Sequence, residues 1–330
     1  MTGQRAWNYG ALLGLAALLL APSPGWAAPC DSVAGCIPQL RFGETRALRE
    51  LAAQQLGERG DPKAIPFLAA SLRGDGGEFV RVRSAEALGR LGTEGSVEPL
   101  GKALDEDRSD LVREAAANAL GNIRARNAAP LLTKALAGDP VWQVRTAAAR
   151  ALGRLGPDLG VAPALSGGLR GDGRREVRIS AAEAIARLKD NGGLQALVTA
   201  LREDAAPQVR DAAAVALSVL DGPGVEEGLL LALREERERS VRRTVAITLG
   251  LRKKESAAPG LVTALQMDPA IEVRQEAAAA LGRIGGDTAR EALTYFAGNS
   301  LFPQIRRAAQ DALDAFVTAT EPKPPAATPN

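Results

Sequence analysis

Histidine is absent from this chain of 330 residues, and aromatic residues make up only 3% of it. Histidine is the side chain that titrates nearest neutral pH and is the commonest metal ligand, so its absence removes the most frequent catalytic and metal-binding chemistry. Beyond residue 27 there is one tryptophan, Trp142, and one tyrosine, Tyr295, which leaves few rings on which bases or sugars could stack. The rest of the sequence shows no recognisable catalytic constellation, and we expect no enzymatic activity, cofactor or metal.

A strong excess of one charge is also missing. The formal net charge is +2, and acidic and basic residues alternate along the chain without a basic tract. Proteins that bind nucleic acid usually carry a basic patch or stripe, because phosphate contacts dominate their affinity. The charge balance therefore argues against a nucleic-acid partner.

Long apolar runs are lacking except near the N-terminus. Arg5 precedes an apolar stretch over residues 11–21, two prolines follow, and small residues stand three and one before a cleavage point after Ala27. This layout is typical of a secretory signal peptide. The stretch is about half of the roughly 20 residues that a membrane span needs. We predict a signal peptide over residues 1–27, a mature chain from Ala28 without a membrane span, and export to the periplasm or the cell exterior.

Cysteine occurs twice, at Cys30 and Cys36, just beyond this cleavage point. An exported protein meets an oxidising compartment, so we expect the two to form a disulfide that orders a short N-terminal segment, residues 28–40. The closed loop is small, which limits its stabilisation to roughly 2 kcal/mol. The alternative is a lipid anchor on Cys30, which the preceding Ala27-Ala28-Pro29 fit poorly.

A string of the form Val-Arg-x-x-Ala-Ala-x-Ala-Leu-Gly recurs along the chain. Complete or degenerate copies start at residues 48, 80, 112, 144, 177, 209, 241, 273 and 305, so the period is 32 residues with one step of 33. Self-similarity at such a period is the signature of a solenoid, in which each unit buries its apolar face against its neighbours. We place the solenoid at residues 41–318 and expect a Pro-rich, disordered tail over 319–330.

Each copy predicts two helices. When the valine is numbered 0, apolar residues fall at positions 0, 4, 7, 8 and 11, which share one face of a helix. A second helix with proline in its first turn precedes the string, for example around Pro130. Position 9 is usually glycine, which lets neighbouring helices approach closely. The expected fold is all-α, a solenoid of about nine helix pairs.

Two polar positions are nearly constant among the copies. Arginine follows the valine in every copy, and aspartate stands five residues before it in most of them. We expect the arginine to bind the aspartate of its own or a neighbouring unit, in a ladder of charge-assisted hydrogen bonds. The alternative is a row that binds external anions. The ladder residues are Asp75, Arg81, Asp107, Arg113, Asp139, Arg145, Asp172, Arg178, Asp204, Arg210, Asp268 and Arg274.

Positions 6 and 10 of the string vary between copies and point away from the apolar stripe. In two adjacent copies they carry apolar residues where the other copies carry mostly polar ones, and an exposed apolar patch with a charged rim often marks a binding site. The alternative is that curvature of the stack buries these side chains, or that they are merely tolerated. The predicted patch is Val215, Val219, Ile247 and Leu251, with Arg154, Arg187 and Arg283 on its rim.

The string, together with the proline and the aspartate, resembles HEAT repeats, and most of all the short subtype named after phycobilin lyase subunits. The resemblance covers residues 41–317 and implies a right-handed stack of antiparallel helix pairs, with the second helices on the concave side. It also implies enzymatic relatives: deoxyhypusine hydroxylase holds iron on His-Glu pairs, which have no counterpart here because histidine is absent.

These observations favour an exported scaffold that presents a curved helical surface to a protein partner of unknown identity. The alternative is an accessory subunit of a bilin-lyase-like or other cofactor-attaching enzyme. The first and last copies carry polar residues at inner positions, Gln55 and Gln310, as expected of terminal units that meet water on one face.

Overall fold

The computed structural model describes residues 30–157 and 159–320. The predicted signal peptide, its cleavage point and the tail beyond residue 320 lie outside the described residues. Within them the chain forms 18 α-helices and no strand, which confirms the all-α solenoid. No helix of the described part is both long enough and apolar enough to cross a membrane.

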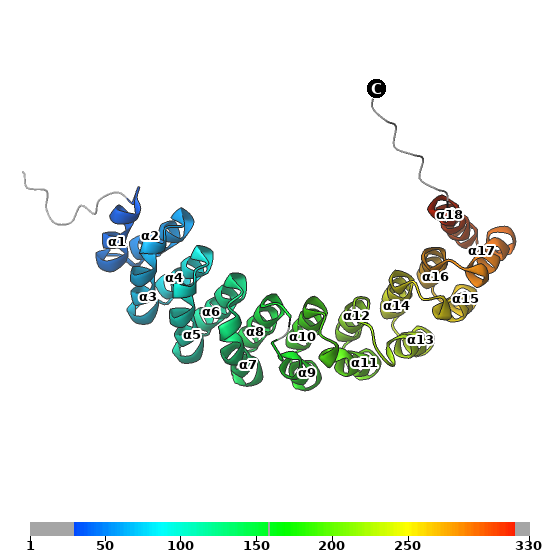
Figure 1. Cartoon of the computed structure of the whole chain (residues 1–330), viewed down its shortest axis with the longest axis horizontal. Coiled ribbons are helices and arrows are strands. Elements are labelled where there is room, and N and C mark those ends of the chain that lie inside the picture. Colours follow the sequence, from blue (N-terminus) through cyan, green and yellow to red (C-terminus); the bar gives the residue numbers. More distant parts are fainter. Residues whose placement is uncertain (1–29, 158, 321–330) are drawn as a thin grey trace, which may run out of the picture.

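The helices form nine antiparallel pairs that follow an arc (Figure 1). The first helices of the pairs line the outer, convex side: α1 (Val33–Phe42), α3 (Ile65–Gly74), α5 (Val97–Glu106), α7 (Ala129–Gly138), α9 (Ala162–Gly171), α11 (Leu194–Glu203), α13 (Val225–Glu235), α15 (Ala258–Met267) and α17 (Asp287–Asn299). The second helices line the inner, concave side: α2 (Arg46–Arg59), α4 (Glu78–Leu91), α6 (Asp110–Ile123), α8 (Trp142–Arg154), α10 (Arg175–Leu188), α12 (Pro207–Ala216), α14 (Arg239–Arg252), α16 (Ile271–Ile284) and α18 (Pro303–Thr320).

The apolar positions of the string form the core between the two layers. In α8, Val144, Ala148, Ala151 and Leu152 are fully buried. Their spacing places them on one face of the helix, which packs on α7 and on the neighbouring inner helices. The same positions are buried in the inner helices from α4 to α16, so the core runs the length of the described solenoid.

The glycine at position 9 sets the distance between inner helices. A Cβ atom added to Gly121 of α6 would lie 2.7 Å from the Cα of Ala151 in α8, and one added to Gly153 would lie 2.8 Å from the Cα of Ala184 in α10. Successive inner helices therefore contact each other through their backbones. Alanine at position 7 of the next unit completes this close approach.

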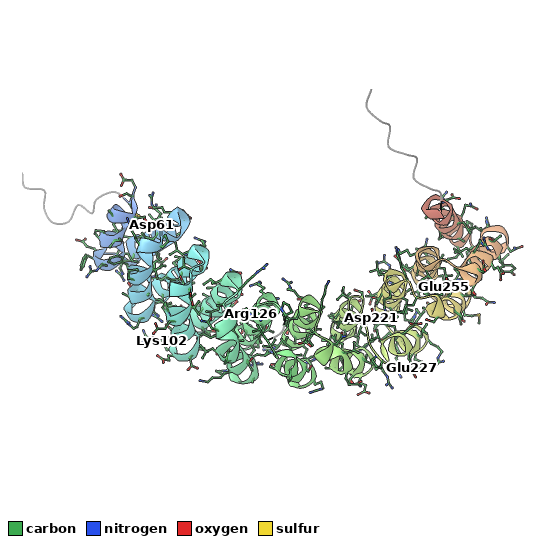
Figure 2. All side chains as sticks on the ribbon, in the orientation of Figure 1. Asp61, Lys102, Arg126, Asp221, Glu227 and Glu255 are labelled. Carbon is green, nitrogen blue, oxygen red and sulfur yellow. A yellow bond between two sulfur atoms is a disulfide. The ribbon has the colours of Figure 1, made fainter. Side chains whose placement is uncertain are left out.

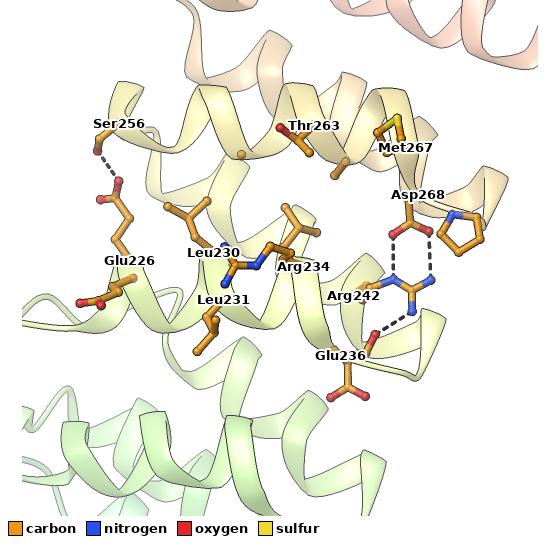
Figure 3. Close-up of a pocket in the computed structure, with 15 residues that line it drawn as sticks. Glu226, Leu230, Leu231, Arg234, Glu236, Arg242, Ser256, Thr263, Met267 and Asp268 are labelled. Atoms are coloured by element: carbon orange, nitrogen blue, oxygen red, sulfur yellow. Dashed lines mark hydrogen bonds and ion pairs between the residues drawn. The ribbon is translucent and has the colours of Figure 1, made fainter.

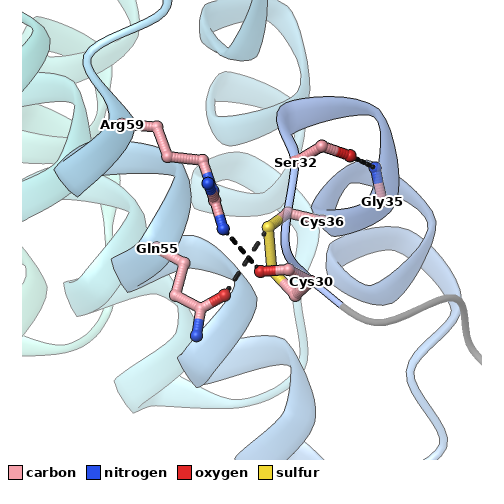
Figure 4. Close-up of a disulfide and its surroundings, with 6 residues drawn as sticks. All are labelled: Cys30, Ser32, Gly35, Cys36, Gln55 and Arg59. Carbon is pink, nitrogen blue, oxygen red and sulfur yellow. Dashed lines mark hydrogen bonds between the residues drawn. A yellow bond between two sulfur atoms is a disulfide. The ribbon is translucent and has the colours of Figure 1, made fainter.

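The solenoid begins earlier than the sequence indicated. Residue 41 falls inside α1, which starts at Val33 and packs against α2. The reason is that the string marks only the inner helices. The outer helix of the first pair lies before the first string, so the string does not reveal it. Cys30 and Cys36 form a disulfide at this end, and Arg59 of α2 donates a hydrogen bond of 2.7 Å to the Cys30 carbonyl (Figure 4).

Candidate functional site

The concave surface is built from the inner helices, whose side chains project into the hollow of the arc (Figure 2). Each inner helix packs against the inner helices before and after it and against the outer helix of its pair. α12, for example, contacts α10, α14 and α11. Its remaining face, and the exposed side chains on it, therefore turn toward the concave opening.

The predicted apolar patch lies on α12 (Val215), in the segment just after α12 (Val219) and on α14 (Ile247 and Leu251). Val215 is 54% exposed, the neighbouring Val219 is 50% exposed and Leu251 is 56% exposed, whereas Ile247 is half-buried. We call these four residues the apolar strip. Three of its members offer apolar surface to solvent, which a folded chain usually reserves for contacts.

The predicted rim arginines lie on both sides of the strip, because Arg154 and Arg187 belong to the preceding units and Arg283 to the following one. The structure brings Arg154 and Arg187 together with Arg150 around a hollow of 320 Å3 between α8 and α10, which we call the arginine hollow. Arg283 is separate from it and stands on α16, beside Gly250.

The arginine hollow is lined by Arg150, Arg154, Ser180, Glu183, Ala184 and Arg187. Arg150 Nε donates to Ser180 Oγ at 3.2 Å, and Arg154 Nη1 donates to Asn122 Oδ1 at 3.2 Å. Burial, and then the positive charges of Arg187 and Arg150, lower the pKa of the Arg154 guanidinium below its ordinary value. The hollow thus gathers like charges at the middle of the inner surface.

Arg150 was not assigned to the site from the sequence. It occupies position 6 of its copy, while Arg154 and Arg187 occupy position 10 of that copy and the next. Because position 10 lies one helical turn after position 6, and consecutive inner helices pack side by side, these three positions meet. Arginine at all three was the available signal.

The ladder arginines bind the carboxylate of the following unit. Arg81 donates from Nε to Asp107 Oδ2 at 2.8 Å and from Nη2 to Asp107 Oδ1 at 2.9 Å, while its Nη1 donates to the Asp75 carbonyl at 3.0 Å. Hydrogen bonding to Asp107 raises the pKa of Arg81 despite its burial. The same pairing joins Arg49–Asp75, Arg113–Asp139, Arg145–Asp172, Arg178–Asp204, Arg210–Glu236 and Arg242–Asp268.

Each carboxylate of the ladder also accepts a backbone N–H two residues farther along, as Asp75 Oδ1 does from Gly77 at 2.7 Å. The carboxylate thereby fixes the turn between the two helices of its pair. The guanidinium groups are bound within the chain, so the structure contradicts the alternative of a row that binds external anions.

Arg274 is the exception to the ladder, and its assignment needs correction. The position that holds a carboxylate in the other units is Ser300 here. Arg274 Nε donates instead to the Leu265 carbonyl at 2.7 Å, and its guanidinium lies 4.7 Å from the centre of the Phe302 ring. The ladder therefore ends at the Arg242–Asp268 pair.

The convex side has grooves between outer helices. One of about 900 Å3 lies between α13 and α15 and is lined by Leu230, Leu231 and Met267 (Figure 3). The Arg242–Asp268 pair closes one end of it. In the part of the chain that the structure describes, no three His, Cys, Asp or Glu residues gather as a metal site would require.

The family model of HEAT repeats matches residues 33–121, 97–173, 129–218 and 226–314. No curated protein matches the chain. Among solved structures, yeast importin-β is 13% identical with a TM-score of 0.63, over 89% of this chain and 46% of that one. YibA of Escherichia coli is 20% identical with a TM-score of 0.52, over 80% and 95% of the two chains. Both likenesses concern the fold.

A complex of the phycocyanin lyase proteins CpcE and CpcF from Nostoc is 22% identical, with a TM-score of 0.37, over 89% of this chain and 98% of that one. With a TM-score of 0.37 this likeness carries no conclusion about activity, so the expectation that the chain has no enzymatic activity stays a prediction.

Proposed function

Since the chain belongs to the HEAT-repeat family, we propose that it is an exported scaffold that binds a protein partner on its concave surface. In this proposal the chain binds without catalysing a reaction, and the side chains at positions 6 and 10 of the inner helices set its specificity. The regular units hold these side chains along one curved surface. The partner would contact several units at once, since each unit offers only a few exposed residues.

The observation that carries the proposal is the exposed part of the apolar strip. Val215 on α12, Val219 just after α12 and Leu251 on α14 are each about half exposed, although the core of the two helices is fully buried. A partner that covers these side chains would remove their apolar surface from water, a transfer worth about 25 cal/mol per Å2 before the entropic cost of association is subtracted.

The test is affinity capture of the tagged chain from the cell envelope fraction, with Leu251→Asp as the variant. Leu251 is 56% exposed, so the variant should keep its helicity, whereas the half-buried Ile247 is a poorer choice. We expect one protein to be recovered with the parent chain and lost with Leu251→Asp. Met267→Asp is the matched control, because Met267 is 70% exposed on the outer layer. Equal recovery with all three chains would contradict the proposal.

Export is the second part of the proposal, and its support is the N-terminal sequence alone. N-terminal sequencing of the chain purified from its own cells should give Ala28 as the first residue, in the periplasmic or extracellular fraction. A chain that retains residues 1–27 in the cytoplasmic fraction would contradict export and leave binding by the concave surface to be judged by the capture experiment.

A further inference from the structure

The arginine hollow holds an uncompensated cluster of positive charge. Three guanidinium groups and one carboxylate, that of Glu183, line it. Among the described residues, Arg150, Arg154 and Arg187 take part in no ion pair. Some exposed arginines elsewhere on the inner helices do pair, as Arg46 does with Glu50 and Arg243 with Glu276. The three arginines of the hollow differ from other unpaired ones, such as Arg90, in lying around one shared hollow.

The three arginines converge because of the packing that joins α8 and α10. Arg150 and Arg154 lie one turn apart on α8, and Arg187 stands near the end of α10. Arg154 is half-buried between them, where its charge is poorly solvated. Like charges at short distance repel more strongly in such surroundings than in water. A bound anion would relieve that repulsion, and guanidinium groups favour planar, bidentate acceptors such as carboxylate.

The surroundings of the hollow indicate what kind of anion fits. α12 packs next to α10, so the apolar strip belongs to the two units that directly follow the hollow along the concave surface. Inner helices are spaced by about 8–10 Å, and an extended peptide advances about 3.3 Å per residue. About six residues therefore reach from Arg154 to Val219. A nucleic acid has no apolar side chains that could cover the strip, and the strip has no aromatic ring on which a base could stack.

We infer that the arginine hollow binds the carboxylate side chains of an acidic segment of the protein partner, whose following apolar residues cover the apolar strip. This inference rests on the proposed function and names the chemistry of the partner. The segment runs across the inner helices from α8 toward α14. Arg154 and Arg187 bind the carboxylates, and Arg150, held by Ser180, supplies further positive charge.

The first experiment selects peptides from a random-sequence phage library on the purified, immobilised chain. The expected consensus is a pair of acidic residues followed, after a short spacer, by two or more apolar residues. A consensus without acidic residues, or no consensus at all, overturns the inference.

The second experiment measures the Kd of the selected peptide by fluorescence anisotropy with Arg154→Gln and Arg187→Gln. Each substitution should weaken binding about tenfold, because each removes a charge-assisted hydrogen bond worth about 1.4 kcal/mol. Arg90→Gln is the matched control: Arg90 is exposed in the last turn of α4, at the same position of its copy, so it reproduces any general effect of charge near a helix end. An equal loss with Arg90→Gln overturns the inference.

Two further measurements distinguish the carboxylates of a partner protein from a small free anion: the affinity of a neutral version of the peptide, and competition by phosphate. The Asn/Gln version of the peptide should bind at least tenfold more weakly, and millimolar inorganic phosphate should compete poorly. Strong competition by phosphate would make the hollow a site for a small anion and overturn the assignment to a partner's carboxylates. In the capture experiment, loss of the partner with Leu251→Asp but not with Arg154→Gln or Arg187→Gln would leave the proposed function standing and this inference refuted.

Discussion

Glycine at position 9 of the string, which has no Cβ atom, controls how closely the inner helices pack. A Cβ at Gly121 would meet the backbone of Ala151 at 2.7 Å, whereas a Cβ at Gly167, in the middle of α9, would meet nothing within 4 Å. Both glycines sit inside helices, so both carry the same loss of helix propensity relative to alanine, about 1 kcal/mol. Substituting alanine at both positions therefore distinguishes the effect of helix propensity from the effect of packing between helices.

Gly121→Ala should destabilise the chain by about 1–3 kcal/mol, because α6 and α8 must move apart to admit the methyl group. Gly167→Ala should stabilise it by up to about 1 kcal/mol, since only the propensity changes. Urea denaturation followed by far-UV circular dichroism measures both. If Gly121→Ala were as stable as the parent, the inner helices would not be held at backbone contact.

Glu236, one of the ladder carboxylates, makes stability depend on pH. Burial alone would raise the pKa of Glu236, but hydrogen bonds from Arg210 and from the Glu238 backbone outweigh it and lower that pKa. A carboxyl whose folded pKa lies below its unfolded value, about 4.3, contributes stability above that pH. The contribution is lost as the pH falls from about 4.3 through the folded pKa.

Glu236→Gln should therefore be less stable than the parent at pH 7, by about 1.5–3 kcal/mol, and the difference should shrink steadily below about pH 4. Urea midpoints at a series of pH values measure it. Glu98→Gln is the control, because Glu98 pairs with Lys102 on the open surface and its removal should change no midpoint measurably. A difference for Glu236→Gln that did not vary with pH would contradict the ladder's role.

At the scale of helices, the last pair, α17 and α18, shows how the turn is built when the ladder carboxylate is absent. Ser300 occupies the turn position of the carboxylate, and its hydroxyl accepts the Phe302 N–H at 3.3 Å. The turn is therefore formed, but Arg274 has no carboxylate across it and bonds to Leu265 instead. The contact between the last two pairs thus lacks the bidentate hydrogen bonds present earlier in the stack.

Ser300→Asp should restore that contact and extend the ladder by one unit. The new carboxylate would accept from Arg274 as Asp268 accepts from Arg242, which should stabilise α17 and α18 by about 1 kcal/mol. Hydrogen exchange of the α18 amides should slow by about fivefold, in proportion to that free energy. Ser300→Asn, which keeps the size and the turn but not the charge, should leave the exchange rates unchanged.

The sequence predicted the inner helices well and their interactions less well. Each string places Val, Ala and Leu on one helical face, so the buried positions of α8 follow from spacing alone. The string did not show whether each arginine binds the aspartate of its own unit or that of the next, because a flexible arginine side chain could reach either. The repeat pattern alone also did not show where α1 begins. It did not show that Arg150 lies beside Arg154 and Arg187, because that arrangement depends on how neighbouring units pack.

At the scale of the whole molecule, the described stack departs from regularity at the junction between α12 and α13. α12 ends at Ala216, so it is shorter than α10 and α14, and the family match leaves residues 219–225 uncovered. Each pair of a solenoid contacts only its neighbours, so the relative placement of the two halves of the arc depends on this junction. Arg252 of α14 makes most of the side-chain hydrogen bonds to the segment that crosses it.

Arg252 holds the junction through the carbonyls of the segment that follows α12. Its side chain is only 4% exposed; Nη1 donates to the Leu217 carbonyl at 2.7 Å and also to the Leu220 carbonyl, and Nη2 donates to Asp221 at 2.6 Å. Lys254 adds a further bond to Asp221 at 2.9 Å. The buried carbonyls have no water to replace these donors, so losing them costs more than an exposed hydrogen bond would.

Arg252→Met should therefore loosen the arc at the α12–α13 junction while leaving each half folded. We expect a loss of about 2–3 kcal/mol in stability with little change in helicity, and a broader distribution of interatomic distances in small-angle X-ray scattering. Arg239→Met is the control, because Arg239 is 73% exposed and pairs only with Glu272 on the surface. If both variants scattered like the parent, the junction would be held by apolar packing, and the curvature that presents the arginine hollow beside the apolar strip would not depend on Arg252.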